Sequence, residues 1–227
     1  MKGIFVKISG VLFCAFLMNS GCVYEVDQTT KSNPSVTIHV PKGSGNPVLL
    51  DGIFSEGEWN DAMKVPMNDS ITLYFKKYRG HFYLGVYTPV YAISVPNAFF
   101  QLNDSTILQL HVSAQLGERL LKPGSADDED SGFNWGYSDG WYANESRWDQ
   151  NRRNYLIDSL GQDNSEAFEM SMFPREGTEI QILQSKLQSD SLKFRIEILI
   201  PPEYDGHNHF PSGTKIKNTE GWTTLLF

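Results

Sequence analysis

Apolar and polar residues alternate along most of the chain after residue 35, in short runs separated by turn residues. In the first run Val36, Ile38 and Val40 share one face, while Thr37 and His39 occupy the other. Side chains that alternate in this way predict a strand with one buried face. Further runs that predict strands lie at 71–75, 82–86, 99–102, 107–113, 168–172, 180–182, 194–200 and 221–227.

These runs predict an all-β fold in which two antiparallel sheets pack face to face. Many short strands with turn residues between them are typical of a β-sandwich, immunoglobulin-like or jelly-roll-like. Tyr78-Arg79-Gly80 separates the second and third runs, which predicts a hairpin with a glycine in its turn. No segment longer than about two helical turns has a helical period, so a sheet built from βαβ units is not expected.

One stretch, VLLDGIFSEGEWNDA at 48–62, differs from the strands around it. Asp51-Gly52 is typical of a tight turn, because glycine adopts positive φ at little steric cost. Ser55 and Glu58 have the spacing of a capping box, which predicts one short helical turn. We expect Trp59, on that turn, to pack onto the face of a β-sheet.

The same residues carry a resemblance to a known family. Asp51-Gly52, Glu56, Glu58-Trp59 and Ala62, followed by the hairpin at 71–87, resemble the opening of family 9 carbohydrate-binding modules and their DOMON-like relatives. FRIEILIPPEY at 194–204 is similar to a late strand of that family. The resemblance extends from Val48 to Phe227. It implies a β-sandwich with a non-catalytic role: binding an oligo- or polysaccharide, beside a partner glycoside hydrolase in carbohydrate catabolism.

The first residues predict export and a lipid anchor. Lys2 and Lys7 precede an apolar run at 8–18, which is too short to span a membrane. Small residues then precede Cys22, so residues 1–21 resemble a bacterial lipoprotein signal, with a plain secretory signal as the alternative. Residues 22–35 are polar and predict a flexible tether, and residues 36–227 form the β-sandwich domain.

The number of cysteines and the net charge limit where the protein is expected to act and which partners it is expected to bind. The two cysteines are Cys14 and Cys22, so removal of the leader leaves one thiol and no intrachain disulfide. We expect a cell-envelope protein that is lipid-anchored to a bacterial membrane, on the periplasmic face or the cell surface. The net charge of −8 disfavours nucleic acid and leaves the lipid anchor as the expected membrane contact.

Residues 117–165 show almost no strand pattern, and a long irregular segment inside a compact domain usually carries function. Three of the five tryptophans fall here, among planar polar side chains. Indole faces pack against sugar C–H groups, while amides, carboxylates and guanidinium groups bind hydroxyls. The alternative is a small core that pins the loop to the sandwich. The predicted carbohydrate-binding residues are Trp135, Tyr137, Asp139, Trp141, Asn144, Arg147 and Trp148.

The sequence also leads to expectations about metal ions, haem and catalytic residues. Asp127, Asp128 and Asp130 could bind structural calcium, although a solvated acidic loop is the simpler interpretation. We expect no other cofactor and no catalytic residues, because the sequence contains no paired-carboxylate or nucleophile motif. A structural or haem-binding member of the same superfamily, without sugar affinity, is the alternative function. Its candidate axial ligands are Met63, Met67, His81 and His111.

Overall fold

The computed structural model describes residues 36–88, 94–113, 115–124, 132–136, 139–144, 176–200 and 207–227. All of them belong to one compact unit, Asn33–Phe227. The elements of the first half are β1 (Thr37–His39), α1 (Glu56–Trp59), β2 (Met63–Pro66), β3 (Thr72–Tyr78), β4 (His81–Tyr87), β5 (Val95–Asn103) and β6 (Thr106–Val112). Those of the second half are β7 (Leu116–Leu121), β8 (Asn134–Trp135), β9 (Trp141–Ala143), β10 (Gly177–Leu183), α4 (Gln184–Leu187), β11 (Ser191–Leu199), β12 (His207–Phe210) and β13 (Thr223–Leu226).

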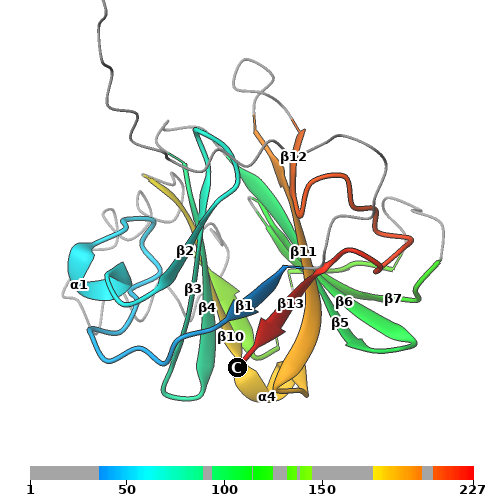
Figure 1. Cartoon of the computed structure of the whole chain (residues 1–227), viewed down its shortest axis with the longest axis horizontal. Helices are drawn as coiled ribbons and strands as arrows, with labels where there is room; N and C mark the ends of the chain where they lie inside the picture. The colour runs from blue at the N-terminus through cyan, green and yellow to red at the C-terminus, as the bar shows by residue number, and fades with distance from the viewer. Residues whose placement is uncertain are drawn as a thin grey trace, which may run out of the picture. The chain divides into compact units, whose positions relative to one another are not determined.

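The strands form two sheets that face each other, as Figure 1 shows. Sheet A has the order β1-β13-β11-β5-β6-β7-β8, with β12 also paired to β11. Sheet B has the order β2-β3-β4-β10-β9. All neighbours are antiparallel except β1 and β13, which run parallel. The predicted two-sheet β-sandwich is therefore confirmed.

The core lies between the two sheets and is built by the alternation seen in the sequence. Leu73 and Phe75 of β3 and Leu84 of β4 meet Phe100 of β5 and Phe194 of β11, and all five are fully buried. Phe75 and Phe194 touch edge to face across the sheets, with ring centroids 5.6 Å apart. Burial of such large apolar side chains is the main stabilising contribution to a sandwich of this kind.

The loop before β2 covers the outer face of sheet B, and Trp59 is its anchor, as predicted. Trp59 is 2% exposed, stacks on Phe54 and packs edge-on against Tyr74. Gly85 of β4 makes this contact close, since a Cβ there would lie 2.6 Å from Phe54 and 3.1 Å from Trp59. A larger residue at position 85 would therefore lift the aromatic layer off the sheet.

The predicted capping box is wrong in its side-chain contacts. Ser55 stands at the N-cap of α1, but its hydroxyl makes no capping hydrogen bond. The backbone carbonyl of Ser55 instead accepts hydrogen bonds from the N–H groups of Glu58 and Trp59. Glu58 itself is buried. The turn is thus held by its backbone and by the burial of Trp59.

An ion pair between the buried Lys76 and the half-buried Asp61 ties the same loop to β3. Lys76 Nζ lies 2.8 Å from Asp61 Oδ1 and also donates to the carbonyl of Glu58. The second oxygen of Asp61 accepts the N–H groups of Ser44 and Gly45. Burial raises the pKa of Asp61, but these donors outweigh it and lower that pKa to about 2. The loop is therefore pinned at both of its ends.

Two sequence expectations about strands need correction. The segment 117–165 was expected to lack strands, but β7, β8 and β9 cover parts of it. No strand was predicted around His207 and His209, where β12 pairs with β11. β7 (LGERLL) and β12 (HNHF) have no clean alternation of apolar and polar residues, and β8 and β9 are two and three residues long. The strand expected at 168–172 lies outside the described residues.

The chain between β12 and β13 covers part of the outer face of sheet A. Trp222 from this segment is fully buried and packs with Phe99 of β5 and Ile107 of β6. Its indole N–H donates to the carbonyl of Lys215. The rest of that face carries polar side chains and, at β8, Trp135. Within the described ranges, no helix is long and apolar enough to cross a membrane.

Candidate binding face of sheet A

Register places one position from each of five strands in a row on the outer face of sheet A: three polar residues, a glycine and a tryptophan. Asn97 on β5 is paired on one side with Glu197 of β11 and on the other with His111 of β6. The row continues through Gly117 of β7 to Trp135 of β8. Four strand spacings of about 4.8 Å give this row a length of roughly 19 Å. We call the stretch from Glu197 to Trp135 the polar row.

A chain of hydrogen bonds fixes how the polar groups beside this row are oriented. Arg119 Nε donates to Gln109 Oε1 at 2.8 Å, and Gln109 Nε2 donates to Asn97 Oδ1 at 3.1 Å. Arginine has only donors, so the amide oxygen of Gln109 must face it. The amide nitrogen of Gln109 must then face Asn97, whose oxygen is the acceptor. One guanidinium group therefore sets the orientation of two amides.

The same chain fixes the tautomer of His111. His111 Nδ1 lies 2.9 Å from Asn97 Oδ1, and because that oxygen only accepts, Nδ1 carries the proton. Burial lowers the pKa of His111, and the positive charge of Arg119 lowers it further, which favours the neutral ring. In the neutral ring Nε2 is an acceptor. Asn97 Nδ2, on a side chain that is 7% exposed, and His111 Nε2, on a half-buried ring, are therefore a donor and an acceptor on adjacent strands.

An aromatic pair stands at the β8 end of the row. Trp135 stacks on Phe133 with centroids 4.6 Å apart and meets the ring of His111 edge to face at 5.1 Å. Arg119 lies 4.3 Å above the Phe133 ring. A Cβ at Gly117 would lie 2.7 Å from Trp135, so glycine lets the indole approach β7. Trp135 is 42% exposed, which leaves indole surface for a ligand.

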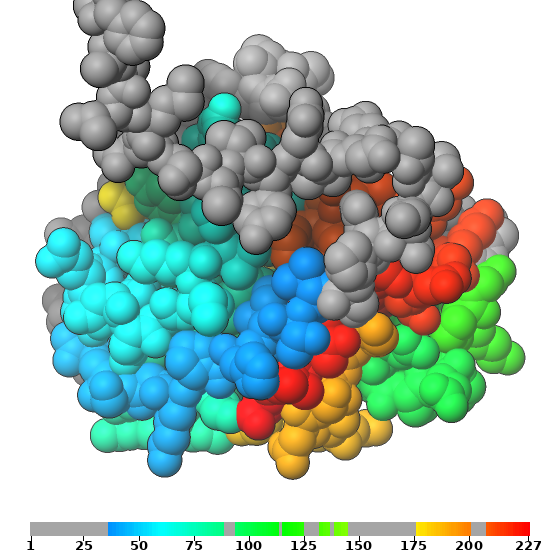
Figure 2. All heavy atoms as spheres, in the orientation of Figure 1, coloured from blue at the N-terminus to red at the C-terminus, as the bar shows by residue number. Residues whose placement is uncertain are grey.

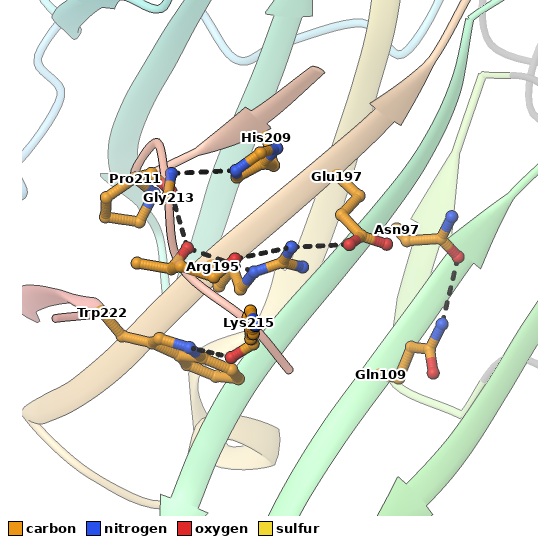
Figure 3. Close-up of polar contacts among 10 residues, drawn as sticks. Asn97, Gln109, Arg195, Glu197, His209, Pro211, Gly213, Lys215 and Trp222 are labelled. Atoms are coloured by element: carbon orange, nitrogen blue, oxygen red, sulfur yellow. Dashed lines mark hydrogen bonds and ion pairs between the residues drawn. The ribbon is translucent and has the colours of Figure 1, made fainter. Parts of the chain in front are cut away.

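At the other end, Arg195 is held against the segment between β12 and β13, as Figure 3 shows. Its Nη2 lies 2.6 Å from Glu197 Oε1, and its Nε donates to Thr214. Arg195 is 3% exposed, and its Nη1 has no hydrogen-bond partner among the described residues. His209 Nε2 accepts the N–H of Gly213 and holds the turn over this end.

The structure separates the residues predicted for carbohydrate binding. Trp135 lies on the polar row, whereas Asp139 is exposed next to β9 of sheet B. Trp141 is fully buried in the core, where its Nε1 donates to Glu118 at 2.6 Å. Asn144 is 2% exposed and hydrogen-bonds the backbone of Gly177 and Glu179. Trp141 and Asn144 are thus corrected to structural residues, because the sheets cover their side chains.

The other predicted positions lie outside the described residues. They are Tyr137, Arg147 and Trp148 of the binding set, Cys22 of the lipid anchor, and Asp127, Asp128 and Asp130 of the calcium site. The part of the chain that the structure describes contains no group of three potential metal ligands. The calcium site stays a prediction.

Four of the residues that build this face were not predicted from the sequence to bind a saccharide. Asn97, Gln109 and Arg119 were not singled out, and His111 was considered only as a haem ligand. His111 lies on the outer face of sheet A, away from Met63 and His81, which belong to β2 and β4 of sheet B. A signal was present, because polar residues at every second position of otherwise apolar strands indicate an outer face with its own chemistry.

Comparisons with known proteins give one structural likeness. No protein-family model matches the chain, and no curated protein is significantly similar to it. Among solved structures, the chain is similar to a family 9 carbohydrate-binding module from Caldicellulosiruptor kristjanssonii in complex with cellotriose. The TM-score is 0.44 at 12% identity, over 84% of this chain and 92% of that chain. A likeness at this level identifies neither a family nor a ligand for this chain.

Proposed function

We propose that this chain is a non-catalytic carbohydrate-binding domain, with its saccharide on the outer face of sheet A beside Trp135. The observation that carries the proposal is the oriented chain from Arg119 through Gln109 to Asn97 and His111. That chain presents a fixed donor and a fixed acceptor next to an exposed indole.

Sugar chemistry matches this combination. A sugar hydroxyl both donates and accepts, so Asn97 Nδ2 and His111 Nε2 together satisfy a pair of neighbouring hydroxyls. A pyranose also has a face of C–H groups, which packs on an aromatic ring such as that of Trp135. Because both amides are already oriented, little conformational entropy is lost on binding. The neutral donor–acceptor pair favours an uncharged saccharide.

Isothermal titration calorimetry with a panel of neutral oligosaccharides, cellotriose among them, tests the proposal. We expect saturable binding by the wild-type domain, and at least about tenfold weaker binding by Trp135→Ala and by His111→Ala. Leu120→Ala is the matched control, because Leu120 is 67% exposed and lies outside the row. Binding that survives in Trp135→Ala, or that Leu120→Ala weakens equally, would contradict the proposal.

The place of action follows from the leader. We infer that lipidation at Cys22 anchors the domain to a bacterial membrane at the periplasmic face or the cell surface. There it would hold glycan for a partner glycoside hydrolase in carbohydrate catabolism. The cysteine after a short apolar run supports this. Metabolic labelling with an alkyne fatty acid should label the wild-type protein and not Cys22→Ser, and equal labelling of both would contradict the anchor.

A further inference from the structure

A pocket lies on sheet B, at the tip of the β3–β4 hairpin. This pocket, of about 180 Å³, opens between the hairpin turn and the segment that follows β1. Figures 1 and 2 show that segment running beside the lower end of the hairpin. The pocket is lined by Lys42, Lys77, Tyr78, Arg79, Gly80 and Gln184.

The lining contains three cations and no acid, although the whole chain carries a net charge of −8. Lys42, Lys77 and Arg79 take part in no ion pair within the described ranges, whose ion pairs involve other basic residues. Three unneutralised cations around one concavity repel each other and attract an anion. An uncompensated positive pocket in an acidic domain therefore indicates an anionic ligand.

The backbone holds the cations in place. The N–H of Lys77 donates to the carbonyl of Pro41, and the carbonyl of Lys77 accepts the N–H of Gly43. Lys42 and Lys77 thus lie side by side in a parallel bridge. The N–H of Gln184 donates to the carbonyl of Gly80, which fixes the opposite wall.

Arg79 adds an observation of its own. It occupies the first turn position with φ of 47°, followed by Gly80 with φ of 79°. Both values are positive, as in the type I′ turn, whose first position favours Asn, Asp or Gly. A positive φ is unfavourable for arginine because of its Cβ, so Arg79 lowers the local stability of the turn. It also places a cation at the pocket. Its guanidinium lies 5.1 Å from the Tyr78 ring centroid, which orients it.

From these observations we propose that the hairpin pocket binds a small tetrahedral oxyanion, phosphate or sulfate, free or as the monoester of a small molecule. The two lysines and Arg79 supply charge and donors, and the Tyr78 hydroxyl and the Gln184 amide supply further donors. The volume exceeds that of one water, about 30 Å³, several-fold, so the pocket holds an oxyanion with its hydration. This proposal is independent of saccharide binding on sheet A.

Titration followed by amide NMR tests the site. Inorganic phosphate and sulfate, added at constant ionic strength against chloride, should shift the Gly80 and Gln184 amides saturably. Glucose 6-phosphate tests the monoester against glucose, and phosphatidylglycerol vesicles test a lipid headgroup. Shifts with inorganic phosphate or with glucose 6-phosphate support the proposal. Binding to vesicles alone, or no saturable shift with any probe, overturns it.

Arg79→Asn is the decisive variant, because asparagine suits the first position of a type I′ turn and the protein should fold at least as stably. We expect phosphate binding to weaken at least about tenfold in Arg79→Asn and in Lys77→Gln. Lys217→Gln removes the same charge from an exposed position between β12 and β13 and should change binding by less than about twofold. Equal weakening by Lys217→Gln, or none by Arg79→Asn, overturns a specific site.

Discussion

Trp59 and Trp135 lie over a glycine on the outer face of a strand, one on each sheet. Over Gly85, Trp59 is covered by Phe54 and the loop before β2, and it is 2% exposed. Over Gly117, Trp135 stacks on Phe133 and meets His111 edge to face, yet it is 42% exposed. The two tryptophans differ in what covers the indole. A tryptophan over a glycine therefore anchors a loop on sheet B and leaves an exposed aromatic surface on sheet A.

Their indole N–H groups differ in the same way. Trp59 Nε1 donates to Glu179 Oε1 at 2.8 Å, and the other oxygen of that carboxyl accepts the N–H groups of Asp51 and Gly52. Glu179 is fully buried, so the polar end of Trp59 is satisfied inside the protein. No internal acceptor for the indole N–H of Trp135 exists within the described residues. A satisfied tryptophan stabilises the fold, and an unsatisfied exposed one is suited to a ligand.

The largest expected effect is on stability at the Trp59 site. Trp59→Ala should lower the free energy of unfolding by about 3–5 kcal/mol, because it leaves a cavity under the loop and a buried carboxyl without its indole donor. Trp135→Ala should change it by less than about 0.5 kcal/mol. Urea denaturation of both variants measures this difference. Equal losses would contradict the assignment of different roles to the two rings.

Adding one methyl group at each glycine should affect the two tryptophans differently. Gly85→Ala should cost about 1–3 kcal/mol of stability, because the new Cβ would meet Phe54 and Trp59 in a closed layer. Gly117→Ala should cost less, since the exposed Trp135 moves aside, but it should weaken saccharide binding. Thermal denaturation and calorimetry measure the two effects. If both variants lost stability alike, Trp135 would be as tightly packed as Trp59.

The stability of the folded protein should depend on pH through Glu179, the carboxyl group that accepts the indole N–H of Trp59. Burial raises the pKa of Glu179 to about 8, with the nearby charges of Asp51 and Glu58 adding to it against the donors from Trp59 and Gly52. The folded state therefore binds a proton more tightly than the unfolded chain, whose carboxyl titrates near 4.5. This contribution to stability is complete below pH 4.5 and is lost as the pH rises through about 8.

Glu179→Gln removes that titration and is the test of it. The variant should be less stable, by about 1–3 kcal/mol, because its amide nitrogen faces the indole donor of Trp59. Between pH 4.5 and 8 its stability should fall less steeply than that of the wild type. Urea denaturation at several pH values provides both curves. Parallel curves would show that Glu179 keeps an ordinary pKa.

Much of the fold was predictable from the sequence, because its determinants are local. Apolar and polar residues alternate in β3, β4, β6 and β11, which indicates a buried face in each strand, and the turn residues Arg79-Gly80 indicate the hairpin. Trp59 was identified as an anchor because the motif around it is contiguous in sequence. The short strands β8 and β9 were not predicted, because two or three residues carry too little pattern.

The site was far less predictable, because its parts come from separate strands. Trp135 and Trp141 are six residues apart in similar surroundings, yet one is exposed and the other fully buried. Their chain neighbours do not distinguish them, since burial depends on which sheet each joins. Asn97 and His111 meet only through the register of β5 with β6.

The smallest expected effect is the pH dependence of saccharide binding at Trp135. A hydroxyl donor needs the neutral Nε2 of His111, and the pKa of this ring lies below its usual 6.5. Binding should therefore be constant near neutral pH and weaken as the pH falls through that lowered pKa. Calorimetry at several pH values should show this for the wild type but not for His111→Gln. An identical decline in both proteins would assign the titration to another group.

Saccharide binding beside Trp135 can be observed directly by an NMR titration of the tryptophan indole N–H signals with the oligosaccharide that binds best. We expect the Trp135 signal to shift saturably, while those of the buried Trp59, Trp141 and Trp222 stay in place. A Trp135 signal that does not move at saturation would contradict saccharide binding on the outer face of sheet A.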